Sequence, residues 1–147
     1  MTDTFDPQEI PVKATTPLPE MPDALLRRAL RIDGTVSAAA GVAVLAAAES
    51  LSAATGMSAA VTVVLGAGSV LCGSAFLVLS RARNVRSGGT SVAGGNAAFT
   101  LFAVAAAVIA SPPLTTVGVL SAVGAGAYTA AMAAAQYRGL RRMSTQV

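Results

Sequence analysis

Four long apolar stretches dominate this sequence, at about residues 35–55, 59–79, 92–110 and 114–137. A helix needs roughly 20 mostly apolar residues to cross the hydrocarbon core of a bilayer. Only 12% of the residues are charged, against about 25% in soluble globular proteins, and a soluble domain with so few charges would expose a large apolar surface. The sequence therefore predicts an all-α integral membrane protein, with a four-helix bundle in residues 23–142.

The breaks between these stretches differ in length. Residues 54–58 and 111–113 have the composition of tight turns, whereas residues 81–95 form a longer Gly- and Ser-rich segment that reads as a loop. This order predicts two helical hairpins. Asp33-Gly34 opens the first span and Gly95-Asn96 opens the third, and each hairpin closes on an arginine cluster. This likeness favours a parallel pseudo-repeat, because both hairpins would start on the same side.

The two ends of the chain are polar. Residues 1–22 contain five prolines, and because proline removes backbone donors, we predict a disordered cytoplasmic tail without a secretory signal. Residues 143–147 form a short cytoplasmic tail. Residues 24–32 combine an apolar side with three arginines, which fits a helix on the membrane surface and equally the beginning of the first span.

The basic residues predict the orientation in the membrane. All of them precede the first span, separate the second from the third, or follow the fourth, and the two tight turns carry none. The positive-inside rule therefore places both termini in the cytoplasm of a multi-pass protein of the inner (plasma) membrane. The arginines expected to contact anionic lipids at that face are Arg27, Arg28, Arg31, Arg81, Arg83, Arg86, Arg138, Arg141 and Arg142.

Small residues recur at helical spacing within the spans. Helices in lipid associate through close backbone packing and hydrogen bonds, so such stripes predict contact surfaces. They fit packing within the bundle better than a dedicated contact between copies, although a homo-oligomer or a larger membrane complex remains the expected kind of partner. The residues of these stripes are Gly118, Ala122, Gly126 and Ala130 in the fourth span and Gly66 and Gly73 in the second.

Glu49 is the one ionisable side chain expected within a span, where helical rise places it in the outer half of the bilayer. An acidic group in lipid is costly unless it faces protein, water or a cation, so Glu49 is the candidate for binding an ion or a proton. The competing interpretation is that water reaches it near the outer end of the span. Asp33 and Asn96 open the first and third spans and are interpreted as helix N-caps. A weaker alternative pairs Asp33 with Arg31 or with an arginine of the loop after span two.

Several kinds of chemistry are excluded by composition. The chain has no His and a single Cys, which excludes a His-based catalytic site, a zinc cluster and an intramolecular disulfide. No nucleophile is paired with a base. We therefore expect no enzyme activity, no metal, no cofactor and no nucleic-acid partner.

Five segments of the sequence carry a resemblance to a known group. They are residues 29–34, the turn ending in Thr55-Gly56, Asn96-Ala97-Ala98-Phe99, residues 114–118 and the closing residues 136–142. Together they resemble the uncharacterised small four-span integral membrane proteins of actinobacteria. That group often has Trp where this chain has Phe99. The resemblance implies the four-span topology and carries no agreed activity.

Two functions are weighed on this basis. The first is a non-catalytic accessory or structural subunit that acts through helix–helix packing, which the small-residue faces and the lack of reactive groups favour. The alternative is a small transporter or channel that uses the carboxylate of Glu49. An aromatic cation pocket does not support the second function, since only 4% of the residues are aromatic.

Overall fold

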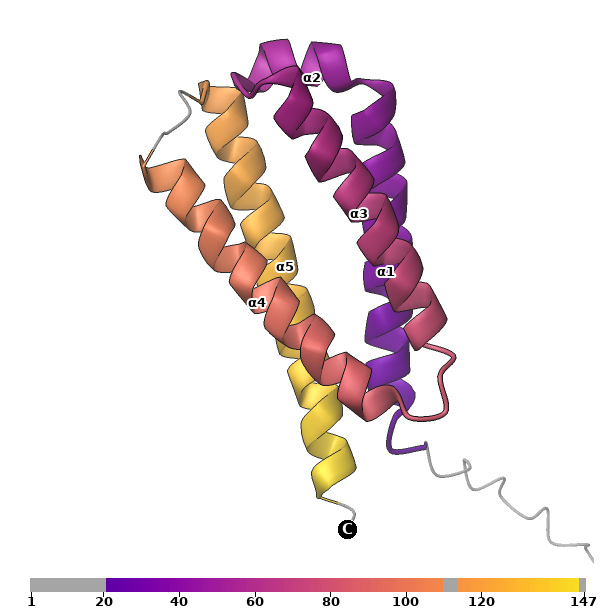
Figure 1. The fold of residues 1–147 in the computed structure, drawn as a ribbon. Helices are drawn as coiled ribbons and strands as arrows, with labels where there is room; N and C mark the ends of the chain where they lie inside the picture. Colours follow the sequence, from indigo (N-terminus) through magenta and orange to yellow (C-terminus); the bar gives the residue numbers. More distant parts are fainter. Residues whose placement is uncertain (1–20, 110–113, 146–147) are drawn as a thin grey trace, which may run out of the picture.

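The chain folds into five α-helices, seen in a computed structural model that describes residues 21–109 and 114–145 (Figure 1). Within these ranges there is no strand, so the all-α prediction is confirmed. The predicted tail lies outside the described residues up to residue 20, as does the predicted turn at residues 111–113. The helices are α1 (Ala24–Ala46), α2 (Ala48–Thr55), α3 (Ala59–Leu79), α4 (Val85–Ile109) and α5 (Thr116–Ser144).

Four of the helices, α1, α3, α4 and α5, are long and apolar enough to cross a membrane. Their outer faces carry large apolar side chains, among them Leu71 and Val108, which are 71% and 78% exposed. Water would make such faces an aggregation hazard, whereas lipid tails accept them without cost. The protein is a small multi-pass membrane protein.

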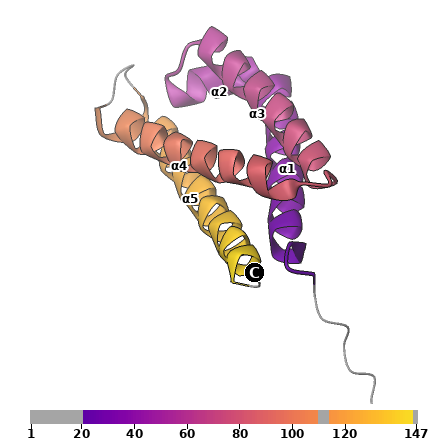
Figure 2. The same ribbon diagram turned by 60° about the horizontal axis from the view of Figure 1, so that its bottom comes forward.

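The helices pair as two hairpins, as predicted. Helix α1 packs along α3 and α4 packs along α5, and the main contact between the hairpins is made by α1 and α5. Figure 2 shows the same two pairs from another side. In Figure 1, the start of α1, the loop between α3 and α4 and the end of α5 lie at one end of the bundle. We call this the basic end, because all the described arginines lie in or next to these segments. Helix α2 lies at the opposite end.

Glycines bring the backbones of α1 and α3 into contact. A Cβ atom added at Gly73 would lie 2.5 Å from the amide nitrogen of Ala38 and 2.6 Å from the carbonyl oxygen of Gly34. Similarly, a Cβ atom added at Gly41 would lie 2.6 Å from the carbonyl oxygen of Gly66. No larger residue fits at these positions without moving a helix. The first hairpin is therefore held by close backbone packing, the main source of helix association in lipid.

Apolar side chains form a core at the basic end. Leu26 and Leu30 of α1 are fully buried against Val85 and Val92 of α4. Side chains from α3 and α5 pack around them: Phe76, Leu79, Leu140 and Met143. All four long helices contribute to this cluster, which lies at the end of the bundle that carries the arginines.

Helix bounds differ from the sequence prediction in α1, α4 and α5. Helix α1 is continuous from Ala24, so residues 24–32 are the beginning of the first span rather than a separate surface helix. The predicted span 35–55 is interrupted at Ala47, whose φ of −113° and ψ of 21° are not helical. Helix α5 continues beyond residue 137, where the fourth span was expected to end, to Ser144.

Residues 85–95, expected in a loop, are the first turns of α4. Glycines in a helix cost roughly 1 kcal/mol each relative to alanine, which is why this segment reads as a loop. Here the glycines serve packing: a Cβ atom added at Gly89 would meet the Leu26 side chain at 2.8 Å, and one at Gly88 would clash with Leu79. Tertiary contact with α1 and α3 therefore outweighs the local propensity.

Candidate functional site

A buried carboxylate, that of Asp33, lies where α1 meets the second hairpin. Asp33 is 1% exposed. It follows Leu26 and Leu30 at helical spacing, so it continues the face of α1 that points into the bundle. The side chain sits inside the helix, nine residues after Ala24. The interpretation of Asp33 as an N-cap is therefore wrong.

Four side chains donate hydrogen bonds to this carboxylate. Its Oδ2 atom accepts from Asn96 Nδ2 of α4 at 2.6 Å and from Gln136 Nε2 of α5 at 2.8 Å. Its Oδ1 atom accepts from the Tyr128 hydroxyl of α5 at 3.2 Å and from Ser37 Oγ, one turn on in α1, at 3.3 Å. Asn96 Nδ2 also donates to Gln136 Oε1 at 3.2 Å. We call these five residues the Asp33 node.

The node saturates the hydrogen-bonding capacity of the carboxylate. An ionised carboxylate offers about four lone-pair positions, and four donors from the chain itself occupy them. All four donors are neutral amides or hydroxyls. The one salt bridge among the described residues joins Arg27 to Asp23, so no described cation is paired with Asp33. Hydrogen bonds alone compensate the removal of this acid from water.

The node lies just inside the basic end. Asp33 is two residues after Arg31, and Gln136 is two residues before Arg138. At 1.5 Å per residue, each lies about 3 Å along its helix from an arginine. Both arginines are exposed. The buried carboxylate therefore lies less than one helical turn along α1 from an exposed arginine of the basic end.

The sequence indicated only part of this site. Asp33 and Asn96 were singled out, but as helix caps; Asn96 instead lies eleven residues into α4 and is 7% exposed. Gln136 is fully buried, and the sequence indicated no role for it beyond its place in the closing segment 136–142. The alternative pairing of Asp33 with an arginine is not formed. The available signal was that all three are polar residues inside apolar helices, within a few turns of an arginine.

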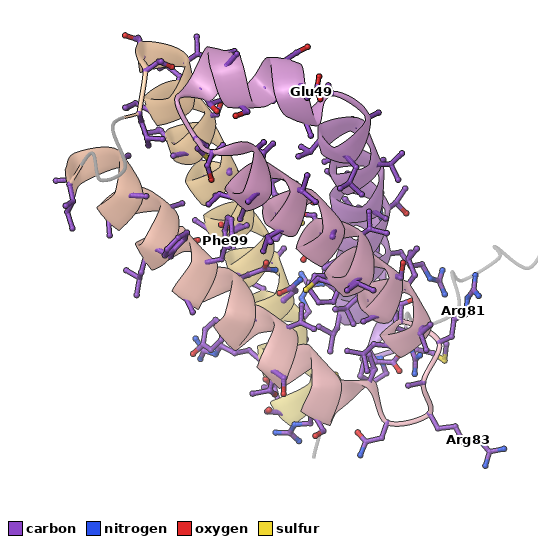
Figure 3. The ribbon with its side chains drawn as sticks, turned by 45° about the horizontal axis from the view of Figure 1, so that its top comes forward. Glu49, Arg81, Arg83 and Phe99 are labelled. Atoms are coloured by element: carbon purple, nitrogen blue, oxygen red, sulfur yellow. The ribbon has the colours of Figure 1, made fainter. Side chains whose placement is uncertain are left out.

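Glu49 lies outside the spanning helices. It is in the first turn of the short helix α2, beyond the break at Ala47, and its side chain is exposed. Figure 3 shows it at the end of the bundle opposite Arg81 and Arg83. It lines an open hollow with Leu45, Ala59 and Val63. The expectation that Glu49 lies within a span is therefore wrong. The described carboxylate that is buried within a spanning helix is that of Asp33.

The small residues of the predicted stripes have different surroundings. Gly66 and Gly73 face α1, as described above. In α5, a Cβ at Gly118 would clash with the carbonyl oxygen of Thr55, and one at Gly126 would touch Ala103 of α4 at 3.4 Å. Ala122 is half-buried, whereas Ala130 faces outward.

Gly139 makes a close contact that the sequence did not single out. A Cβ atom there would lie 2.9 Å from backbone and side-chain atoms of Leu26. This contact is made by α1 and α5, the two helices that join the hairpins.

The arginines are not equivalent. Arg27 donates to the carbonyl oxygens of Ser80 and Ala82, both at 2.9 Å, and to Asp23 at 2.7 Å. These hydrogen bonds connect the first turn of α1 to the residues that follow the end of α3. Arg86 donates to Ser144 Oγ at 2.9 Å and is exposed. The remaining arginines are exposed at the basic end: Arg28, Arg31, Arg81, Arg83, Arg138, Arg141 and Arg142.

Among residues 21–109 and 114–145, no group of three His, Cys, Asp or Glu side chains comes together that could hold a metal ion.

Comparison of the chain with protein-family models, with curated proteins and with solved structures finds no match.

Proposed function

We propose that this protein is a non-catalytic membrane subunit that acts through helix–helix packing, as an accessory or structural component. The saturated Asp33 node is the observation that carries the proposal. A carboxylate that transports a metal cation or an organic substrate must offer it an acceptor position, and all four positions on Asp33 are taken by the chain itself. Such a network holds three helices in one arrangement.

The outer surface supports the same function. Gly68 of α3, Gly94 and Gly95 of α4 and Gly124 of α5 have nothing within 4 Å of the position of a Cβ atom. These helices therefore present small outward positions among large apolar side chains. Such positions let a neighbouring helix approach closely in lipid. A second copy of the chain or a larger membrane complex is the kind of partner that this surface suits.

The proposed location is the plasma membrane, with the basic end and both termini in the cytoplasm. The exposed arginines gather at one end of the bundle, and the positive-inside rule assigns that end to the cytoplasm. The same arginines would meet the phosphates of anionic lipids. Membership of the actinobacterial four-span group is part of this proposal.

A transporter or channel using Glu49 is the second candidate. The hollow lined by Glu49, Ala59 and Val63 favours it, because an ion could reach the carboxylate from outside. The position of Glu49 in α2, beyond the end of α1, counts against it, because a coupling site needs access from both sides in turn.

Two measurements on the purified full chain distinguish these functions. Native mass spectrometry after extraction in a mild detergent should show a stoichiometric assembly with itself or with larger subunits. In proteoliposomes with an imposed proton or sodium gradient, the protein should add no flux to that of empty vesicles. A flux that Glu49→Gln abolishes at unchanged protein level would contradict the subunit role and establish the second candidate.

A further inference from the structure

The two oxygens of the Asp33 carboxylate have chemically different partners. Oδ2 is held by two amide groups, at 2.6 and 2.8 Å. Oδ1 is held by two hydroxyl groups, at 3.2 and 3.3 Å. An amide NH₂ can only donate a hydrogen bond, whereas a hydroxyl donates or accepts according to how it is rotated. The amides at Oδ2 therefore require that oxygen to act as an acceptor. The hydroxyls at Oδ1 can instead accept a hydrogen bond from the carboxyl group.

A proton added to Asp33 has one place where it fits. On Oδ2 it would point at two NH₂ groups that cannot accept it. On Oδ1 it can be donated to the oxygen of Tyr128 or Ser37, whose own hydrogen rotates away. A serine hydroxyl in a helix can turn to the backbone carbonyl one turn earlier. The carboxylate takes up one proton, its charge changes from −1 to 0, and both amide hydrogen bonds remain.

The surroundings of Asp33 hold no charge that opposes this step. Among the described residues, α5 contributes Tyr128 and Gln136, α4 contributes Asn96, and α3 packs on neighbouring Gly34 with Gly73 and Leu77. Tyr128 is the one titratable group among them. The nearest arginines along α1 and α5, Arg31 and Arg138, are exposed and form no ion pair with Asp33.

We propose that Asp33 is a proton-binding site, in which Oδ1 takes up the proton from the aqueous phase at the basic end. Hydrogen bonds to a charged acceptor are roughly twice as strong as those between neutral groups. Proton uptake therefore weakens the attachment of α1 to α4 and α5, so the node senses pH on the side that carries the arginines. This regulation goes beyond the packing role and does not depend on any transport.

Infrared difference spectroscopy of the full chain in lipid nanodiscs tests the proposal directly. Acidification from neutral pH should produce the carbonyl-stretch band of a protonated carboxyl in an apolar site. Asp33→Asn should lose this band, whereas Glu49→Gln, which alters the exposed carboxylate at the other end, should keep it. Asn96→Ala should move the band to higher frequency, because the carbonyl at Oδ2 loses a donor. Tyr128→Phe should move it less, because it changes the partner of the O–H group.

Each result decides the proposal. A wild-type spectrum without the band contradicts it, as does a band that survives in Asp33→Asn. A band that responds to Tyr128→Phe and not to Asn96→Ala would place the proton on Oδ2 and overturn the assignment. If Asp33→Asn does not fold, the shifts in the other two variants still identify the carboxyl. If the proposed packing function is wrong, the mass spectrometry and flux measurements described above would show it, independently of the infrared result.

Discussion

At the scale of single residues, the defining feature is a buried acid that has only neutral partners. The five residues of the Asp33 node come from three helices, and three of them, Asp33, Asn96 and Gln136, are nearly or fully buried. Leaving one buried partner without its hydrogen bond costs about 1–3 kcal/mol. Removing one residue of the node would therefore destabilise the fold mainly because its buried partners would lose their hydrogen bonds.

Tyr128 provides a test with a matched control. Tyr128→Phe removes one donor to Asp33 Oδ1 and should lower the free energy of unfolding by about 1 kcal/mol, since hydrogen bonds between helices in membranes are of that order. Tyr137→Phe makes the same chemical change at an exposed position of the same helix and should have little effect. Reversible unfolding in detergent mixtures measures both. Equal losses in the two variants would mean that the Tyr128 bond adds nothing.

The node could not be assembled from the sequence alone. Asp33 and Asn96 are 63 positions apart, and Asp33 and Gln136 are 103 apart. Each looks like a local feature, a cap or a boundary, when it is read beside its neighbours in sequence. The packing of α1 against α4 and α5 brings these residues together, and no sequence pattern in the three helices indicates which of them pack against one another.

At the scale of elements, glycine position decides which helices touch. The α1–α3 contact has glycines on both sides, and Gly66 and Gly73 were recognisable as one face of α3 from their spacing. The start of α4 was harder to predict, because Gly88 and Gly89 are typical of a loop. Only their contacts with the side chains of Leu79 and Leu26 explain why these glycines lie in a helix. The break at Ala47 has no local signal, since alanine is the best helix former.

Two glycines of α3 make a direct comparison. Gly73→Ala would place a methyl group 2.5 Å from the Ala38 backbone, so it should push α1 and α3 apart and lower the free energy of unfolding by about 1–3 kcal/mol. Gly68→Ala has nothing within 4 Å and should be neutral or slightly stabilising. The unfolding measurement used for Tyr128 serves here. A destabilised Gly68→Ala with an unaffected Gly73→Ala would reverse the assignment of the packed face.

At the scale of the whole molecule, an even number of crossings brings the arginines to one end. This topology followed from the sequence, because the clusters alternate with uncharged turns. The way in which the hairpins join, through α1 and α5 with a shared apolar core at the basic end, did not follow. Alanine-rich helices offer many equivalent faces, so the choice among them depends on a few glycines and polar side chains.

The proposed orientation predicts which side chains meet the outside of the cell. In a Cys72→Ser background, Ser50→Cys on α2 should react with a membrane-impermeant maleimide added to intact cells. Arg83→Cys, which is also exposed but lies at the basic end, should react only after the membrane is opened. Labelling of Arg83→Cys in intact cells would invert the topology.

A double-mutant cycle between Asp33 and Gln136 tests the central claim, that a buried hydrogen-bond network joins α1 to α5 and so joins the two hairpins. The free energy of unfolding is measured for wild type, Asp33→Leu, Gln136→Leu and the double variant. We expect each single change to be destabilising and the double change to cost less than their sum, with a coupling of about 1 kcal/mol or more. Additivity of the two changes within about 0.5 kcal/mol would show that these residues do not act together, and would contradict the account.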